Sequence, residues 1–513
     1  MSALKPLKTA IIDIGSNTVR LVMYKYDKNS GLHEFGNIKT VAKLRQHILP
    51  TGEMSEEGIQ SLSKTLTSFK QILDDYDVKD VKAAATAAIR QATNNAEIVA
   101  RMKAETDIDI DILTEEEEAY FGFVAVANSM ETSSAVTIDI GGGSTEITLF
   151  KNKKLQKTYS FPFGTVSLKQ RFVKGDMIVE EERKKMHAYL IEQFKTLKWI
   201  RDVELPVIGI GGSARNIGQV HQQRIHYPIS GLHQYEMERS ELDDLKLHLI
   251  QLTFDELKQL DGLSSDRADT IVLAMEVFTS LMDVVKTKQF LISKKGLREG
   301  LIINRVLLDD PTAFDKYNVF EETARRFAFE YGRSEKELAT LYRLASQMYE
   351  EACKLGYFDK TEADLTLITN AAKVFAIGEY IELDSSSQHT FYLLANQSIA
   401  GMTHKERVKL ALLASYKNRD YFSRFTQPFI SWFSREELRI LRDFGALLKF
   451  VHALNVSKRN SVEKLELVHA DDIVVVKVYA TESAVAEVYQ ASKTKKHIER
   501  VFKKDVLIEF IFI

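Results

Sequence analysis

The chain has 513 residues, of which 45% are hydrophobic and 27% are charged, and its formal net charge is −3. This length predicts three or four domains, and the composition excludes bulk disorder. So small a net charge gives no sign of a nucleic-acid partner, and affinity for any polyanion would have to come from a local basic patch. The single cysteine, Cys353, excludes an internal disulfide and fits a reducing compartment.

The N-terminal stretch MSALKPLKTAIIDIG lacks the long apolar run of a signal peptide. No window of the chain approaches about 18 uncharged apolar residues. We therefore expect a cytoplasmic protein without a membrane partner.

The first expected element is a strand, a turn and a second strand, in TAIIDIGSNTVRLVMYKY. The stretch AVTIDIGGGSTEITLF, at residues 135–150, has the same order of apolar run, Asp-Ile-Gly turn and apolar run. Superposing Asp13 on Asp139 places Gly15 on Gly141. We interpret the two stretches as an internal repeat.

Between these strands, segments such as GIQSLSKTLTSFKQILDDY have apolar residues at spacings of three and four, which predicts helices. A third glycine-rich turn, LPVIGIGGSARNIGQV, follows a short apolar run at residues 205–210 and leads into an expected helix. Strands that alternate with helices predict an α/β sheet in at least two related halves.

From about residue 315 the chain has an almost wholly helical pattern, and its end, as in DIVVVKVYA and DVLIEFIFI, returns to alternation. The sequence therefore predicts two α/β domains, a helical module and a small α/β unit. Their expected ranges are 1–127, 128–308, 309–465 and 466–513.

The repeated turns suggest a phosphate clamp, because glycines let backbone N–H groups approach an anion closely. Asp13 and Asp139 end their strands at the turns, where carboxylates can hold Mg²⁺ (or Mn²⁺). The simpler alternative is that each turn is only a tight hairpin. The duplication and the third glycine-rich turn argue against it.

Dinucleotide binding fits less well, because no turn spells G-x-G-x-x-G between a strand and a helix, and no P-loop lysine pattern is present. The spacing resembles instead the actin, sugar-kinase and heat-shock ATPase superfamily, in which two duplicated domains clamp phosphates between two such hairpins. That resemblance implies a duplicated actin-like (ribonuclease H-like) α/β clamp and leaves the reaction open.

Further motifs narrow the reaction. Arg90 follows a small-residue run in AAATAAIRQATNN, a carboxylate cluster begins LTEEEEAYFGFVAVA, and Arg298 stands in SKKGLREGLI. Together with the turns at Asp13 and Asp139, these motifs resemble the exopolyphosphatase and guanosine pentaphosphate phosphatase (Ppx/GppA) family. The resemblance covers roughly residues 8–305 and includes FPFGTVSLKQRF and DRADTIVLAMEVF.

The resemblance implies a hydrolase in which Glu118 is the catalytic base that activates water against the terminal phosphate. Glu117 is its rival, because the acidic run allows either register. A carboxylate crowded by others and facing a polyanion should have a raised pKa, as a base working near neutrality needs. Glu146 would be the second carboxylate, and Arg90 the bidentate cation on the transferred phosphoryl group.

The resemblance also implies that the three turns supply phosphate-binding donors. These residues are Gly15, Ser16, Asn17, Thr18, Gly141, Gly142, Gly143, Ser144, Thr145, Gly211, Gly212 and Ser213. Arg298 is expected to bind phosphate, with an interdomain salt bridge as the equal alternative. One departure is that Lys43 and Arg45 stand where the family more often has Arg-Leu-Gly, so a point charge would replace a planar fork.

The helical segment that contains LITNAAKVFAIGEYIELDSSSQHTFYLLANQ resembles the HD-type phosphohydrolase helices often fused to this family. Its metal dyad is missing, since residues 375–378 read FAIG where His-Asp-x-Gly would be expected. We expect His389 to be a surface or packing residue, and the module to be structural, as a polyanion track or a dimer surface.

The leading function is an exopolyphosphatase that releases orthophosphate from the ends of inorganic polyphosphate. The alternative substrate is guanosine pentaphosphate, with guanosine tetraphosphate as a further ligand. A kinase would share the clamp without needing Glu118 as a base, and a non-enzymatic actin-like scaffold is the remaining alternative. We also expect a homodimer.

Overall fold

The protein is described by a computed structural model that covers residues 6–28, 30–470 and 472–513. The chain divides into two compact units. The first unit runs up to Tyr227 and continues over Leu232–Val319, and the second comprises Pro228–Gly231 and Phe320–Ile513. Among the described residues, no helix is long and apolar enough to cross a membrane.

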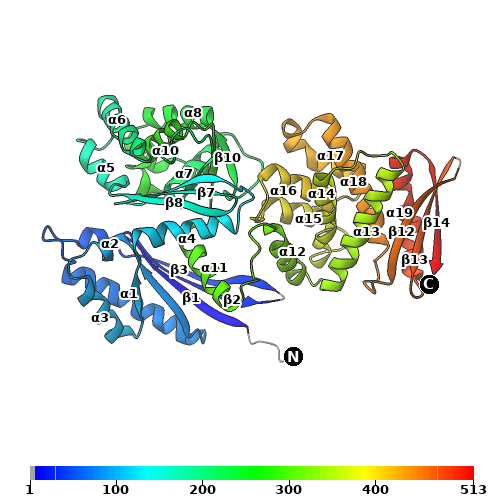
Figure 1. Cartoon of the computed structure of the whole chain (residues 1–513), viewed down its shortest axis with the longest axis horizontal. Coiled ribbons are helices and arrows are strands. Elements are labelled where there is room, and N and C mark those ends of the chain that lie inside the picture. Colours follow the sequence, from blue (N-terminus) through cyan, green and yellow to red (C-terminus); the bar gives the residue numbers. More distant parts are fainter. Residues whose placement is uncertain (1–5, 29, 471) are drawn as a thin grey trace. The chain divides into compact units, whose positions relative to one another are not determined.

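The first unit contains two α/β lobes (Figure 1). Lobe 1 is built on a five-stranded sheet of order β3-β2-β1-β4-β5. Its strands are β1 (Leu7–Ile14), β2 (Thr18–Asp27), β3 (Gly31–Val41), β4 (Asp80–Ala85) and β5 (Ile110–Ile112). Its helices are η1 (Leu44–His47), α1 (Glu56–Asp75), α2 (Ala87–Arg90) and α3 (Asn95–Thr106).

Lobe 2 is built on a six-stranded sheet of order β10-β11-β9-β6-β7-β8. Its strands are β6 (Ala135–Ile140), β7 (Thr145–Lys151), β8 (Lys154–Phe161), β9 (Val207–Ile210), β10 (Tyr235–Glu238) and β11 (Gln289–Ile292). Its helices are α5 (Thr165–Phe172), α6 (Glu180–Thr196), α7 (Gly211–Arg224), α8 (Arg239–Gln251), α9 (Phe254–Gln259), η2 (Ser265–Arg267) and α10 (Ile271–Val285).

The two sheets repeat one arrangement of strands. β1 pairs antiparallel with β2 and parallel with β4, and β6 pairs in the same way with β7 and β9. The predicted internal repeat is therefore confirmed as two equivalent hairpins, each followed by a parallel strand. This arrangement brings both Asp-Ile-Gly turns to the carboxyl ends of strands, where α/β sheets bind their ligands.

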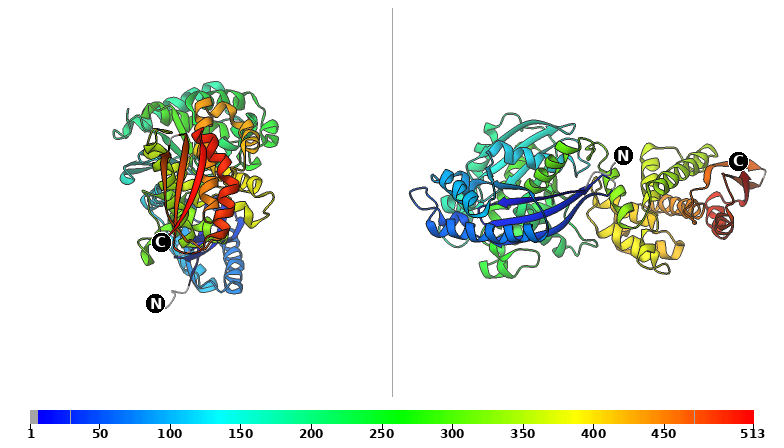
Figure 2. Two further views of the ribbon diagram at one scale, coloured as in Figure 1. Left: turned by 90° about the vertical axis from the view of Figure 1, so that its right-hand side faces the viewer. Right: turned by 90° about the horizontal axis from the view of Figure 1, so that it is seen from below.

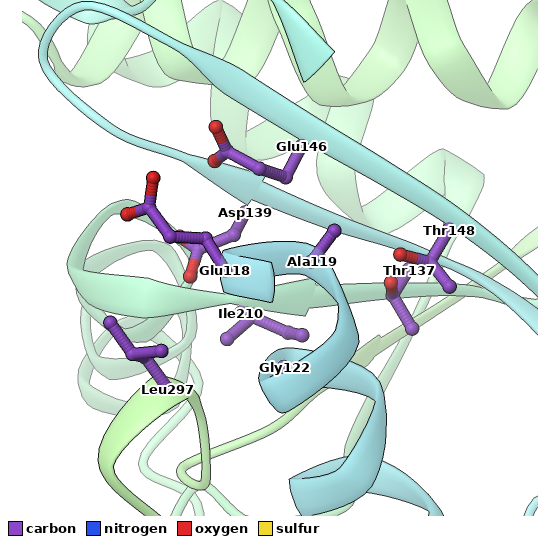
Figure 3. A pocket seen from close by; sticks show the side chains of 9 residues that line it. All are labelled: Glu118, Ala119, Gly122, Thr137, Asp139, Glu146, Thr148, Ile210 and Leu297. Carbon is purple, nitrogen blue, oxygen red and sulfur yellow. The ribbon is translucent and has the colours of Figure 1, made fainter. Parts of the chain in front are cut away.

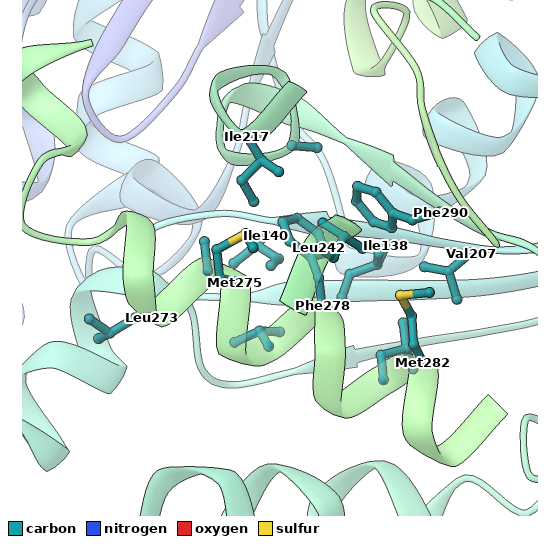
Figure 4. Close-up of a cluster of buried hydrophobic side chains, with 14 of the residues drawn as sticks. Ile138, Ile140, Val207, Ile217, Leu242, Leu273, Met275, Phe278, Met282 and Phe290 are labelled. Carbon is teal, nitrogen blue, oxygen red and sulfur yellow. The ribbon is translucent and has the colours of Figure 1, made fainter. Parts of the chain in front are cut away.

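The core of lobe 2 depends on α10, which is apolar on nearly every side (Figure 4). Met275, Phe278 and Met282 are buried against strand residues such as Ile138 and Phe290. A helix that is apolar all round must be covered on all sides. The sheet covers one side of α10, and α5, α6, α7 and α8 contact the rest.

Two helices connect the lobes. α4 (Glu115–Ala127) packs on β7 and β8, whereas α11 (Leu297–Asp309) packs on β1, and the two helices contact each other. A Cβ atom on Gly300 would lie 1.9 Å from the carbonyl oxygen of Phe121, so only glycine allows this approach. The approach fixes the first turn of α4 beside the turns of both sheets.

The second unit begins with helices and ends with a small sheet of order β12-β13-β14 (Figures 1 and 2). Its helices are α12 (Val319–Glu330), α13 (Glu335–Lys354), α14 (Glu362–Lys373), η3 (Ile377–Tyr380), α15 (Ser386–Asn396), α16 (His404–Ala414), α17 (Arg419–Thr426), η4 (Gln427–Trp432), α18 (Arg435–Ala453) and α19 (Val485–Phe502). Its strands are β12 (Val462–Ala470), β13 (Ile473–Ala480) and β14 (Asp505–Phe512). The sheet thus begins just before the expected boundary at residue 466.

An arginine occupies the region of the degenerate metal motif in this unit. Arg333 is buried and donates hydrogen bonds to the carbonyl oxygens of Lys373, at 2.9 Å, and Phe375. The Phe375 ring lies 5.1 Å from the ring of His452. Burial lowers the pKa of His452 to about 3. Among the described residues, no group of three or more His, Cys, Asp or Glu side chains could hold a metal ion.

Candidate active site

The two Asp-Ile-Gly turns have the same geometry. The Gly15 N–H donates to the carbonyl oxygen of Thr18 at 3.0 Å, and the Gly141 N–H donates to that of Ser144 at 2.9 Å. Each turn closes its hairpin through one such bond, and an aspartate is the second-to-last residue of the strand before it. Asp13 and Asp139 therefore face the same space from opposite lobes, and both line one cavity of about 410 Å³.

The cavity carries more charge than the turns alone predict. Six cationic side chains line it: Arg20, Lys39, Arg215, Arg267, Lys294 and Arg298. Five acidic side chains also line it: Asp13, Glu118, Asp139, Asp266 and Glu299. Such a mixed lining can bind a polyanion and can also position groups for acid–base chemistry.

Glu118 lies on the first turn of α4 and is 15% exposed. Burial raises the pKa of Glu118 to about 7, and the nearby charges of Asp139 and Asp13 also raise it. Arg90 acts in the opposite direction, because its Nη1 atom donates to Glu118 Oε2 at 2.6 Å. A carboxyl group with a pKa near neutrality can accept a proton at physiological pH.

Arg90 ends α2 and is held by Leu113 of its own lobe and by two residues of α4. Its Nη1 atom also donates to the carbonyl oxygen of Leu113 at 2.7 Å, and Nη2 lies 3.8 Å from Glu115. Nη2 is buried and makes no hydrogen bond to the described residues. The structure therefore brings Arg90 to Glu118 and leaves one guanidinium nitrogen available as a donor.

Glu146 is the second buried carboxylate and lies directly opposite Asp139 in the β6–β7 ladder. It accepts a hydrogen bond from Ser160 Oγ at 3.1 Å. Burial raises the pKa of Glu146 to about 8, and the charge of Glu118 adds to the effect. Figure 3 shows the carboxyl groups of Glu118 and Glu146 on the same side of a small internal pocket of about 40 Å³.

The repeat differs at the position that Glu146 occupies. In lobe 1 the residue opposite Asp13 in the β1–β2 ladder is Arg20, so the equivalent pair is of opposite charge. Opposed like charges destabilise a sheet, whereas opposite charges stabilise it. The like-charged Asp139–Glu146 pair is therefore a feature that stability does not explain, as is common at functional sites.

Glu117 has a different environment from Glu118. Its carboxylate accepts hydrogen bonds from the N–H, at 2.8 Å, and the hydroxyl, at 3.1 Å, of Thr114. The Thr114 hydroxyl in turn accepts from the Glu117 N–H, which completes a capping box. Glu117 thus caps the N-terminus of α4. Glu118, the other member of the pair, lines the cavity.

Asp13 and Asp139 were predicted as metal ligands. Burial raises the pKa of both groups, and Arg298 lies 3.9 Å from Asp13. Gly211, with a φ of +83°, leaves room for Asp139, because a Cβ atom there would lie 2.3 Å from Asp139 Oδ1. Two hard oxygen donors that share a cavity fit Mg²⁺, which is commonly held by one or two carboxylates together with substrate phosphates.

The predicted phosphate-binding residues fall into two sets. Asn17, Thr18, Gly211, Gly212 and Arg298 line the cavity. The rest of the predicted set, among the described residues, does not line it: Gly15, Ser16, Gly141, Gly142, Gly143, Ser144, Thr145 and Ser213.

Several of the second set already have partners. The Thr145 hydroxyl is buried and donates to the carbonyl oxygen of Phe163 at 2.6 Å, and Ser213 Oγ accepts from Arg267 at 3.1 Å. The carbonyl oxygens of Gly141 and Gly142 accept bonds from the first N–H groups of α5. These residues therefore fix the shape of the turns.

Five cavity cations were missed by sequence reasoning. Arg20 follows the first turn on the next strand, and Arg215 lies one helical turn after Gly211 and Gly212, so spacing from the turns could have identified both. Arg267, Lys39 and Lys294 come from separate elements that only the fold brings together. Arg267 and Lys294 stand in the stretches DRADTIVLAMEVF and SKKGLREGLI that carry the family resemblance, whereas no local pattern marks Lys39.

The Lys43–Arg45 departure lies beside the second turn. Arg45 donates a hydrogen bond to Gln91, next to Arg90, and its Nη1 atom lies 3.8 Å from where a Cβ atom of Gly143 would be. Lys43 adopts a left-handed backbone conformation with a φ of 49°. Arg45 thus supplies a planar guanidinium between the two lobes, although the sequence predicted that a point charge would replace a planar cation at this position.

Two family models match the chain. The Ppx/GppA phosphatase family matches residues 22–309, and domain III of the Ppx/GppA phosphatases matches residues 319–484.

Curated relatives share low identity with the chain. A bifunctional 3-dehydroquinate synthase/phosphatase of Fusobacterium nucleatum is 26% identical over 58% of this chain, which matches only 46% of that relative. A guanosine-5'-triphosphate,3'-diphosphate pyrophosphatase of Aliivibrio fischeri is 23% identical over 90% of this chain and 92% of the relative.

Solved structures agree with the fold of the first unit. A Ppx/GppA family member from Aquifex aeolicus is 26% identical, with a TM-score of 0.55 over 60% of this chain and 99% of that one. An exopolyphosphatase from Cytophaga hutchinsonii is 27% identical, with a TM-score of 0.53 over 58% of this chain and 97% of that one. With the repeated turns and the match over residues 22–309, these similarities show that the chain belongs to the Ppx/GppA phosphatase family.

Proposed function

We propose that this phosphatase is an exopolyphosphatase, which hydrolyses the terminal phosphoanhydride bond of inorganic polyphosphate in the cavity of the first unit. The observation that carries the proposal is the meeting of Glu118, poised near neutrality, with six cationic side chains in one cavity. A chain of phosphates needs cations along its length and a base at its end. This cavity offers both.

The lining favours a substrate without a base or sugar. None of the described residues that line the cavity is aromatic, so none of them would stack on a guanine ring. The guanosine pentaphosphate alternative draws support from the Aliivibrio fischeri relative, which is named for that substrate class and matches along nearly its whole length. We retain it as the second candidate.

The proposed reaction assigns a task to each buried group. Glu118 accepts a proton from the attacking water, and Arg90 orients Glu118 through its 2.6 Å bond, while its Nη2, which makes no hydrogen bond to the described residues and lies 3.8 Å from Glu115, would donate to the phosphoryl group. Glu146, whose carboxyl group lines the same small pocket as that of Glu118, orders the water. Asp13 and Asp139 would hold Mg²⁺, which when bound neutralises charge on the phosphate oxygens.

The substrate assignment predicts the outcome of one assay. Purified protein is incubated separately with long polyphosphate, short polyphosphate and guanosine pentaphosphate, and released orthophosphate is measured. Polyphosphate should be hydrolysed with the higher kcat/KM. A higher kcat/KM on guanosine pentaphosphate would make the second candidate correct, and release from neither would overturn both.

Glu118→Gln should abolish turnover while leaving polyphosphate binding intact, because it removes the proton acceptor at nearly constant volume. General-base catalysis typically contributes about 100- to 10,000-fold. Glu117→Gln is the matched control, because glutamine also completes a capping box and should leave the rate nearly unchanged. If instead Glu117→Gln is inactive and Glu118→Gln is active, the register of the base is off by one residue.

The pH dependence of kcat should have an acidic limb near pH 7. Glu118 works only when deprotonated, so activity rises with pH as the group with a pKa of about 7 loses its proton. Arg90 lowers the pKa of Glu118, and Arg90→Gln should therefore move this limb to higher pH, apart from any loss of rate. If the acidic limb of Arg90→Gln stays at the same pH as that of the unmodified protein, Arg90 does not lower the pKa of the base.

Asp13→Asn should raise the Mg²⁺ concentration needed for half-maximal activity, because it removes a hard oxygen donor beside a highly charged substrate. Asp266→Asn is the control, since Asp266 lines the same cavity without a proposed metal contact. Equal Mg²⁺ titrations for the two variants would count against Asp13 as a ligand.

A further inference from the structure

The small internal pocket of about 40 Å³ adjoins the larger cavity at the proposed base. Four residues line both spaces: Glu118, Asp139, Ile210 and Leu297. Glu146, Thr137 and Thr148 line the pocket without lining the cavity. The pocket is therefore an inner extension of the cavity, on the far side of Glu118 from the space that a substrate would fill.

A pair of threonines lines this inner pocket (Figure 3). Thr137 and Thr148 lie opposite each other in the β6–β7 ladder, two residues from Asp139 and Glu146 and on the same face of the sheet. Their side chains are buried, with exposures of 2% and 1%. Within the described chain, neither hydroxyl has a hydrogen-bond partner. A buried hydroxyl without a partner costs free energy, so water is the expected partner of both.

The internal repeat shows that the fold does not need these threonines. In lobe 1 the equivalent positions are Ile11 and Val22, which also lie opposite each other in their ladder. Both are buried in an apolar cluster with residues of α11. Lobe 2 thus departs from the repeat at Thr137 and Thr148 as it does at Glu146, and all three departures line one pocket.

The size and lining of the pocket suit water. One buried water needs about 10–15 Å³ of such volume and two to four polar partners, so the pocket has room for about three. The carboxyl groups of Glu118 and Glu146 offer partners, and so do the two threonine hydroxyls. Sites for organic ligands are several times larger, so an alcohol acceptor such as a sugar does not fit.

We propose that Thr137 and Thr148 are positioning residues that hold a short row of water molecules in this pocket, from which the attacking water is delivered. The inference rests on the proposed function, hydrolysis of a phosphate chain held in the cavity. Phosphoryl transfer places the attacking and leaving oxygens on opposite sides of the phosphorus. Because the remaining chain leaves on the cavity side, the water attacks from the pocket side.

Each turnover consumes one water from this row. The water oxygen forms a bond to the terminal phosphorus, and its proton passes to Glu118. The bridging P–O bond breaks, and its electron pair stays on the shortened chain. A bound polyphosphate blocks the way through the cavity, so the next water moves up from the threonines without passing the substrate.

Valine variants test the role of the hydroxyls. Thr137→Val with Thr148→Val removes both hydroxyls at similar volume, and the aliphatic pair in lobe 1 indicates that the fold accepts the change. We expect kcat on polyphosphate to fall by about 10- to 100-fold, the loss that corresponds to two hydrogen bonds to water. KM should not change, because the cations of the cavity are untouched.

Two further variants separate the hydroxyls from packing. Thr137→Ser with Thr148→Ser keeps both hydroxyls and should restore kcat. Thr158→Val is the matched control, since Thr158 lies opposite Thr148 in the β7–β8 ladder and its buried hydroxyl has no partner among the described residues, yet it does not line the pocket. Its kcat should equal that of the unmodified protein. A serine variant as slow as the valine variant would contradict the proposal.

A crystal structure of the protein without substrate tests the pocket independently of activity. Ordered water should lie within hydrogen-bonding distance of both threonine hydroxyls, and the valine variant should lack it. An active protein without this water overturns the inference alone, as does unchanged kcat in the valine variant. A protein that releases phosphate from none of the candidate substrates overturns the proposed function as well.

Discussion

The structure depends on holding four acidic side chains in a small volume. Asp13, Asp139, Glu118 and Glu146 converge there, and burial raises the pKa of each. Such a cluster is costly unless cations offset it. Arg90 bonds Glu118 directly, and Arg215 and Arg298 lie close enough to lower the pKa values of Asp139 and Asp13.

The same cluster explains why the repeat is imperfect. Both hairpins carry an aspartate one residue before the end of their first strand, yet the residue opposite is Arg20 in lobe 1 and Glu146 in lobe 2. In the proposed reaction, lobe 1 thereby supplies a cation for an anionic substrate, and lobe 2 supplies a second carboxylate for water. α4, which carries Glu118 on its first turn, packs against α11 at Gly300.

Much of the fold could be predicted from the sequence, because the turns repeat with fixed spacing and the helical periodicity changes near residue 315. The capping role of Glu117 was also readable, since Thr114 three residues earlier completes a Thr-x-x-Glu signature. The meeting of Lys39, Arg267 and Lys294 in one cavity was not predictable, because they come from separate elements, although Arg267 and Lys294 stand in stretches that carry the family resemblance. The hydrogen bond from the buried Thr145 hydroxyl to the carbonyl oxygen of Phe163 likewise depends on packing between residues distant in the sequence.

The central claim is that these carboxylates direct water against the terminal phosphorus of a phosphate chain. Hydrolysis in water enriched in oxygen-18, followed by analysis of all products, tests it most directly. The account predicts one solvent oxygen in each released orthophosphate and none in the shortened chain. Label in the remaining chain, or transfer of phosphate to an acceptor without label, would contradict it.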